Sequence, residues 1–424
     1  MTHRMVLILA VTCAVAVGNI YFPQAVSPLI AADLGVSPDS AALVVTCTQV
    51  GYTAGVFLLV PLGDRLPHRS FLVTLLALTG AGLLAAGCAP SLAALAAAAV
   101  LVGVTTVAAQ VIAPLAAGLV AADRRGAVMG TLLSGSIGGM LLARSFSGAL
   151  GEWLGWRAPY LVAAAAVLLL ATVLAVALPV TAPRASDSAS APTLASAPAL
   201  APAPASRETY PALLAGSLRL LRTEPELRRS CSYQAAVFAG FSAVWTCLAL
   251  LLTGPAYGMG AQAVGALALV GAATMFCTPL AGRVVDRRGS DPVNLACMVG
   301  VLASAAILAL GAGGGAPGLA ALVLGTLLLD VAMQCGMVAN QARVFALRPE
   351  ARSRLNTAYM TCVYLGGSAG SWIGVRVYGR AGWYGVCALV AVLAVLALAR
   401  HLFAPYGRSS RYADAPADAA ASRS

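Results

Sequence analysis

The fold can be inferred from the stretch Gly63-Asp64-Arg65-Leu66-Pro67-His68-Arg69, because a related stretch, Gly282-Arg283-Val284-Val285-Asp286-Arg287-Arg288-Gly289, lies in the second half of the chain. Each copy stands between two long uncharged segments, with an Asp-Arg pair where the first segment ends. Both copies therefore predict tight turns between membrane-spanning helices. Because an acid at the start of a helix accepts hydrogen bonds from free N–H groups, we expect Asp64 and Asp286 to cap the helices that follow.

The composition places the chain in a lipid bilayer. Hydrophobic residues make up 60% of the 424 residues, charged residues make up 10%, and the mean hydropathy is +0.87, which excludes a water-soluble globule. The net charge of +11 comes from arginines scattered over short segments, so no continuous basic face is predicted for nucleic acid. The ten cysteines lie within or beside apolar segments without any CxxC spacing, which predicts buried thiols and no metal site.

The apolar segments predict twelve membrane spans, since a helix needs about 20 apolar residues to cross the hydrocarbon core. These segments begin near Met5, Ala41, Phe71, Leu92, Ala127, Ala158, Ser232, Ala261, Val293, Gly318, Asn356 and Gly382. Residues 182–206 are rich in Ala, Pro and Ser and predict a disordered linker. From Tyr210 to Arg229, leucines lie among arginines, a pattern typical of a helix on the membrane surface, with a solvated connector as the alternative.

Four units are therefore expected. They are a six-helix bundle (1–181), a cytoplasmic linker (182–231), a second six-helix bundle (232–404) and a disordered cytoplasmic tail (405–424). Of the 26 arginines, 22 lie at the N-terminus, in even-numbered loops or in the tail, and three lie in odd-numbered loops. Because basic loops stay in the cytoplasm, we predict that both termini are cytoplasmic. We also expect the protein to be a monomer in the cell inner membrane.

Further matches relate the two halves. In the same order along each half, Arg125 corresponds to Arg354, Gly138-Gly139 to Gly366-Gly367, and Gly155-Trp156 to Gly382-Trp383. Small residues also recur every four positions and predict close helix packing, as Gly135, Gly139, Ala143, Ser147 and Gly151 in the fifth span and as Gly366, Gly370 and Gly374 in the eleventh. Six spans repeated in one orientation are the parallel repeat of a secondary transporter, whose site lies between the halves near the midplane.

The chain resembles the major facilitator superfamily over nearly its whole length. The doubled Asp-Arg turn, the six-plus-six plan and the central linker carry this resemblance. Three short motifs resemble the bacterial efflux-permease branch of this family, which includes the arabinose and purine-nucleoside exporters. They are Asn340-Gln341-Ala342-Arg343, Arg354-Leu355-Asn356 and Gly366-Gly367. The resemblance implies an all-α fold of twelve helices and drug:proton antiport by alternating access.

The family's turn reads roughly G-x-x-x-D-R-x-G-R-[KR]. The second copy keeps Gly282, Asp286, Arg287 and Gly289, whereas the first copy has Val60 and Pro67 in place of glycines. The resemblance implies that two pairs, Asp64 with Arg65 and Asp286 with Arg287, latch the cytoplasmic faces of the halves and reset as the carrier switches.

Two departures concern proton antiport. The family's antiporter pattern G-P-x-x-G-G is expected in the fifth span, where this chain reads Ala143-Arg144-Ser145-Phe146-Ser147-Gly148. The frequent arginine of the fourth span is missing, because residues 91–122 carry no charge. Antiport is thus implied by the resemblance and not by these residues, and proton-coupled uptake stays open.

Arg144 and Asp330 are the two charged residues predicted to lie well inside spans. A charge at a helix centre costs roughly 3 kcal/mol on insertion scales, so such residues usually face a cavity or a partner. Asp330 can carry the coupling proton, because burial favours a neutral carboxyl. The alternative is an acid that stays neutral. Arg144 either adjusts the protonation equilibrium of Asp330 from the other half, or it anchors its own helix by reaching the outer end.

The predicted substrate site combines amide, phenol and indole groups with one carboxylate. Asp330, Gln334 and Gln341 share one helical face, which we expect to line the cavity. Polar residues near the middle of other spans are Asn19, Tyr21, Gln49, Thr106, Gln110 and Trp245. For any one of them, hydrogen bonding between helices is the alternative. Together they suit a small polar or amphipathic organic solute.

We therefore predict a secondary transporter, not an enzyme, that exports a sugar, nucleoside, metabolite or drug in exchange for protons. The alternatives are an uptake symporter and a membrane sensor that binds without translocating. The lack of a sizeable soluble domain speaks against the sensor. The chain contains no lysine, so it has no P-loop and we expect neither ATP nor any other cofactor to drive transport.

Overall fold

The computed structural model describes residues 3–63, 65–120, 125–178, 209–348 and 351–403, and the regular elements in these ranges are helices. The first half contains α1 (His3–Gly18), α2 (Phe22–Leu34), α3 (Pro38–Gly63), α4 (His68–Gly87), α5 (Leu92–Thr105), α6 (Ala108–Leu119), α7 (Arg125–Leu154) and α8 (Arg157–Ala177). Helix α9 (Tyr210–Thr223) follows. The second half contains α10 (Pro225–Thr253), α11 (Ala261–Val270), η2 (Gly271–Ala273), α12 (Thr274–Arg288), α13 (Ser290–Leu310), η3 (Gly311–Gly313), α14 (Gly315–Leu347) and α15 (Arg352–Phe403).

Every predicted span coincides with helix. Within the described ranges, nine helices are long and apolar enough to cross a membrane, and α1 and α2, bent by 41°, form a tenth span as a pair. Helix α15 holds two predicted spans joined at Gly382, whose φ of 61° breaks the helical path and favours glycine. The remaining span is the broken path of α11, η2 and α12.

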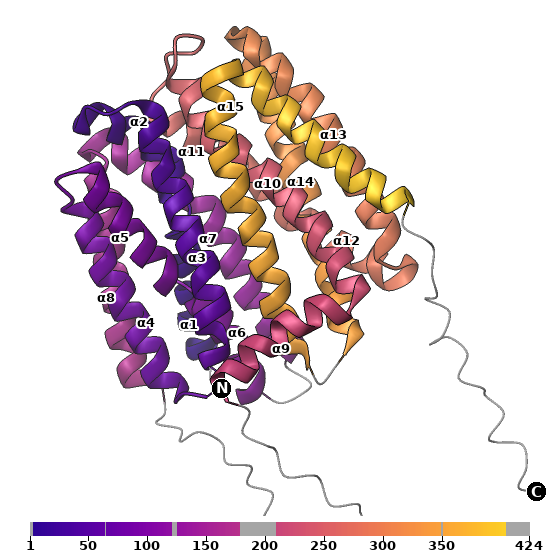
Figure 1. Cartoon of the computed structure of the whole chain (residues 1–424). Coiled ribbons are helices and arrows are strands. Elements are labelled where there is room, and N and C mark those ends of the chain that lie inside the picture. The colour runs from indigo at the N-terminus through magenta and orange to yellow at the C-terminus, as the bar shows by residue number, and fades with distance from the viewer. Residues whose placement is uncertain (1–2, 64, 121–124, 179–208, 349–350, 404–424) are drawn as a thin grey trace, which may run out of the picture.

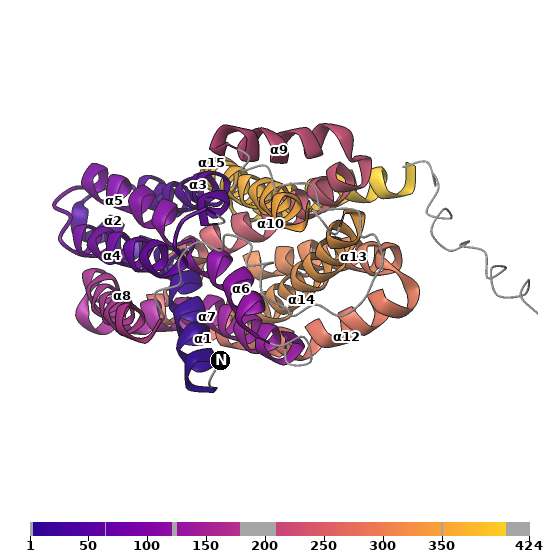
Figure 2. The same cartoon turned by 90° about the horizontal axis from the view of Figure 1, so that it is seen from below.

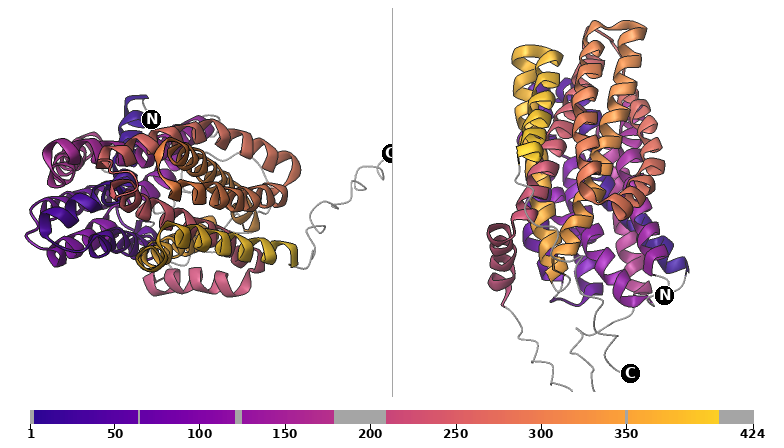
Figure 3. Two further views of the ribbon diagram at one scale, coloured as in Figure 1. Left: turned by 90° about the horizontal axis from the view of Figure 1, so that it is seen from above. Right: turned by 90° about the vertical axis from the view of Figure 1, so that its right-hand side faces the viewer.

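The two halves lie side by side. Figures 1 and 2 show α1 to α8 on one side of the molecule and α12, α13 and α14 on the other. Figure 3 shows the same division from above and from the side, with α9 along the outside of the bundle. We call the end that holds the turns at residues 63–69 and 282–290 the motif end.

The stripes of small residues bring helix backbones into contact in both halves. In α7, a Cβ added to Gly139 would lie 2.0 Å from the Ala14 carbonyl oxygen of α1. In α15, a Cβ added to Gly370 would lie 2.1 Å from the Ala239 carbonyl oxygen of α10. The same close packing thus joins the fifth span to the first and the eleventh to the seventh, as the predicted repeat requires.

This contact leads to a stability prediction. We expect Gly139→Ala to lower the free energy of unfolding by about 1–3 kcal/mol, because the added methyl overpacks two backbones. Gly138→Ala is the matched control on the same helix, since a Cβ added there meets no other described helix or side chain within 4 Å. Thermal unfolding of both variants in detergent measures the difference, and equal melting temperatures would contradict the packing.

The capping prediction for Asp286 is wrong. Helix α12 continues through the charged residues to Arg288, so Asp286 lies in its last turn, and the chain turns at Gly289 with φ of 79°. The acid in the first turn of α13 is Asp291. The apolar pattern ends before the helix does, because α12 stays helical through Arg283, Asp286, Arg287 and Arg288. Asp64 lies outside the described residues.

The segment after the linker forms two helices. The prediction of one helix from Tyr210 to Arg229 is corrected by a break at Glu224, and Pro225 begins α10. Proline suits the first turn of a helix, where its missing N–H is not needed. Residues 182–206 and 405–424, predicted to be disordered, lie outside the described residues.

Candidate functional site

Arg144 reaches from α7 into the centre of the molecule and is fully buried. Its guanidinium carbon lies 4.1 Å from the ring centroid of Trp245 and 4.7 Å from that of Tyr21, which are cation–π distances. Its Nε donates a hydrogen bond of 2.7 Å to Oε1 of Gln24. Within the described ranges, Nη1 and Nη2 have no hydrogen-bond partner. Arg144 thus faces the second half and does not reach the end of its helix.

The break between α1 and α2 supplies two of these partners. Tyr21 lies in the break, and Pro23 stands in the first turn of α2, where proline is favoured. Gln24 follows one residue later and is fully buried. The broken first span therefore places a phenol ring and an amide next to Arg144.

Asp330 of α14 lies in the same region and is 1% exposed. Its Oδ1 accepts a hydrogen bond of 2.9 Å from Nε1 of Trp245 on α10. Its Oδ2 lies against Gly271 at the start of η2, where an added Cβ would be 2.6 Å away. Arg144 and Asp330 interact electrostatically, although no ion pair within 4.0 Å joins these two described residues. The Trp245 indole contacts both charges.

The other predicted residues of the first half form hydrogen bonds between helices. Asn19 donates to Oγ1 of Thr106, which donates in turn to the Ala16 carbonyl. Gln110 donates to the Tyr52 hydroxyl at 3.3 Å. These contacts agree with the alternative to substrate binding, in which each residue forms hydrogen bonds between helices of one half.

Gln49 is the member of this set that crosses between the halves. Its Nε2 donates to Oγ of Ser242 on α10 at 3.4 Å, and its Oε1 is buried without a partner in the described part of the chain. Nearby, the ring of Tyr52 lies 4.5 Å from the ring of Tyr364 on α15. The hydrogen bond between Gln49 and Ser242 would therefore break if the halves moved apart.

The stripe predicted on α14 extends away from the buried charges. Gln334 is 7% exposed and lies one turn from Asp330. Gln341 lies about 16 Å along the helix from Asp330, at 1.5 Å per residue, and donates to Oδ1 of Asn356 at 3.4 Å. The shared helical face is real, but its length separates Gln341 from the buried charges.

Small polar groups of α3 and α15 also join the halves. Thr46 donates to Ser371 at 3.0 Å, and Thr53 and Ser368 lie at 3.4 Å. Near the far end of α7, Glu152 accepts a hydrogen bond of 2.7 Å from the backbone N–H of Ala261. Hydrogen bonds therefore join the halves where α3 meets α15 and where α7 meets α11.

The predicted latch residues that the structure describes are exposed at the motif end. Arg65, Asp286 and Arg287 are all exposed, and the structure describes no ion pair for them. Gly282 and Gly289 lie in the last turns of α12 and at its end. Their role as a latch stays a prediction.

Ion pairs near this end are formed by residues that sequence reasoning missed. Asp291 pairs with Arg343 and, at 3.1 Å, with Arg229, which also lies 3.6 Å from Glu226. The position of Asp291 directly after the second turn and of Arg343 in the Asn340-Gln341-Ala342-Arg343 segment could have indicated them. Gln24 and Phe241, whose ring lies 5.5 Å from Arg144, were also missed.

A bundle of membrane-spanning helices with two related halves and buried charges between them defines the class of membrane transporters. The family model of the Major Facilitator Superfamily matches residues 7–327. The chain is 32% identical over 398 residues to an uncharacterized transporter, YgaY, of Escherichia coli, covering 94% of this chain and 95% of that protein. The protein belongs to the Major Facilitator Superfamily.

Two further comparisons are informative. A chloramphenicol resistance protein of Streptomyces lividans is 32% identical over 274 residues, which cover 63% of each chain. A crystal structure of a bacterial homolog of the human lysosomal transporter Spinster, in an inward-facing and unoccupied conformation, covers 95% of this chain and 96% of its own, with a TM-score of 0.69 and 16% identity. This likeness confirms the predicted fold. The protein is accordingly a multi-pass transporter of a small molecule and not an enzyme.

Proposed function

We propose that this transporter exports a small organic solute, such as a sugar, nucleoside, metabolite or drug, in exchange for protons by alternating access. It would act in the cell inner membrane, with both termini in the cytoplasm. The observation that carries the proposal is the arrangement of Asp330, Trp245 and Arg144 at the boundary between the halves.

Asp330 is suited to carry the proton. It is buried, and the described residues offer it a hydrogen bond from Trp245 but no ion pair within 4.0 Å. A carboxylate in such a place is stabilised mainly by the indole N–H and by the nearby charge of Arg144. Protonation of Asp330 removes the negative charge, so it weakens the attraction between a residue of α14 and a residue of α7. The charge of Asp330 is thereby linked to the contact between the halves.

Competition between the solute and a proton for the carboxylate of Asp330 favours antiport. A cationic or polar solute that binds near Asp330 is favoured by its charged form, whereas a proton neutralises it. Solute and proton then bind in alternation, which is the requirement for antiport. The relative named as a chloramphenicol resistance protein supports export. Proton-coupled uptake is the second candidate, because Arg144 stands where the family's antiporter pattern has proline.

The test is a panel of metabolites and drugs on cells that lack or overproduce the protein. We expect overproduction to lower the intracellular level of at least one compound and to raise resistance to it if it is toxic. A protonophore should abolish the difference. Higher accumulation on overproduction would replace export with uptake, and an effect that persists with the protonophore would exclude proton coupling.

A further inference from the structure

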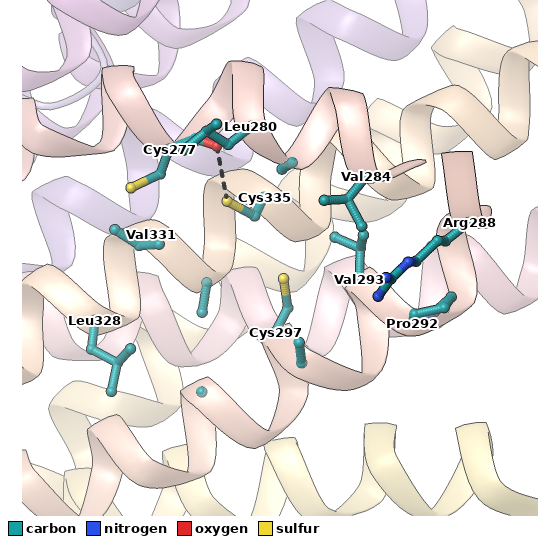
Figure 4. A pocket seen from close by; sticks show the side chains of 14 residues that line it. Cys277, Leu280, Val284, Arg288, Pro292, Val293, Cys297, Leu328, Val331 and Cys335 are labelled. Atoms are coloured by element: carbon teal, nitrogen blue, oxygen red, sulfur yellow. Dashed lines mark hydrogen bonds between the residues drawn. The ribbon is translucent and has the colours of Figure 1, made fainter. Parts of the chain in front are cut away.

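A groove opens on the second half of the molecule, away from the buried charges. It lies between α12, α13 and α14 and has a volume of ≈ 450 Å³, within the range of about 300–1,000 Å³ typical of ligand sites. Figure 4 shows its lining, which includes the thiols of Cys277, Cys297 and Cys335. Of the side chains that line it, Arg288 is the one that carries a charge.

The groove follows the membrane-spanning part of these helices. Leu328, two residues before Asp330 on α14, lines one end, and Arg288 in the last turn of α12 lines the other. In Figure 4 the Arg288 side chain lies over Val293, with its nitrogens turned toward the groove. Arg288 is exposed, and the described residues give it neither a hydrogen bond nor an ion pair.

The rim of the groove is suited to hydrocarbon. Leu280 and Val284 of α12 line it and are 57% and 40% exposed. Exposed apolar side chains next to an apolar hollow mark a surface that other apolar groups cover. In a membrane span, acyl chains supply those groups.

We propose that this groove binds an anionic phospholipid, with an acyl chain along the apolar lining and the phosphate on Arg288. A guanidinium forms paired, charge-assisted hydrogen bonds with phosphate oxygens. Basic pockets between membrane helices at the cytoplasmic side bind anionic headgroups in this way. Arg287, the neighbouring residue in the last turn of α12, adds positive charge at the same end. A lipid without net charge satisfies the apolar lining but leaves this charge unmatched.

The test compares lipids retained by the full-length protein. The purified transporter is incubated with phosphatidylglycerol or phosphatidylcholine, and bound lipid is counted by native mass spectrometry. We expect the wild type to bind phosphatidylglycerol more tightly. Arg288→Gln should reduce that preference by about fivefold, since one basic residue near the membrane surface is worth roughly 1 kcal/mol.

Two variants control the result. Arg283→Gln removes an exposed charge of the same helix that does not line the groove, and we expect it to keep the preference. Ala296→Phe fills the groove from an exposed position of its lining, and it should lower the occupancy of both lipids. Equal binding of the two lipids by the wild type, or an unchanged preference in Arg288→Gln, would overturn the proposal. Unchanged occupancy in Ala296→Phe would place the lipid elsewhere.

Discussion

Asp330→Asn is expected to lose most of the accumulation that a pH gradient drives, while exchange of solute for solute continues. The neutral amide keeps the shape of the carboxyl and can still accept the Trp245 hydrogen bond through its carbonyl oxygen. It cannot gain or lose a proton, so the link between proton and solute is lost. Coupling energies of this kind are worth about 5–150-fold, and we expect a loss in that range.

The measurement uses reconstituted vesicles and the solute that the cellular panel identifies. Uptake or release is followed with a pH difference alone and, separately, in exchange mode without one. Asp39→Asn is the control, because Asp39 is an exposed acid in the first turn of α3, at the end opposite the motif end. If Asp330→Asn still concentrates solute against its gradient, another acid couples transport to protons.

Arg144→Leu should lower the rate of transport by about 30-fold. A desolvated cation–π contact is worth about 2 kcal/mol, which corresponds to that factor when the contact is lost in the rate-limiting step. The substitution also leaves Oε1 of Gln24 without its donor, and it removes the positive charge that faces Asp330. Arg144→Lys should be intermediate, because a lysine keeps the charge but not the planar guanidinium.

A second cation–π pair provides the matched control. Arg376 lies 4.0 Å from the ring centroid of Trp372, but both side chains are exposed. Arg376→Leu removes the same type of contact where water screens it, so we expect transport close to wild type. Initial rates should be normalised to the amount of folded protein, since Arg144→Leu also alters the interior. Equal rates in the two leucine variants would remove Arg144 from the mechanism.

Much of the architecture could be predicted from periodicity. The apolar segments and the repeated turns define the spans, and the glycine stripes marked α7 and α15 as helices that pack closely, although their partners α1 and α10 emerge only from the structure. The ends of α12 could not be predicted in this way. Its last turns are charged, and only the helical backbone itself shows that Asp286 lies before the turn and Asp291 after it.

The candidate site was predictable as a set of residues but not as a set of contacts. Arg144, Trp245 and Asp330 stood out because charged and indole groups are rare in these spans. Whether they meet depends on how far each helix is rotated and where the first span breaks. Gln24 illustrates this: it seemed to belong to a continuous apolar segment, and the break at Tyr21 turns it toward Arg144.

The contact between Thr53 of α3 and Ser368 of α15 affects the energy needed to separate the two halves. Each of these two hydroxyls also donates a hydrogen bond within its own helix. Thr53 donates to the Gln49 carbonyl, and Ser368 donates to the Tyr364 carbonyl. When the halves separate, the hydroxyls of Thr53 and Ser368 both keep a partner, so neither of these two donors is left unsatisfied. Separating this pair therefore costs little, whereas the Thr46–Ser371 and Gln49–Ser242 hydrogen bonds and the contact of Arg144 with Trp245 must be broken.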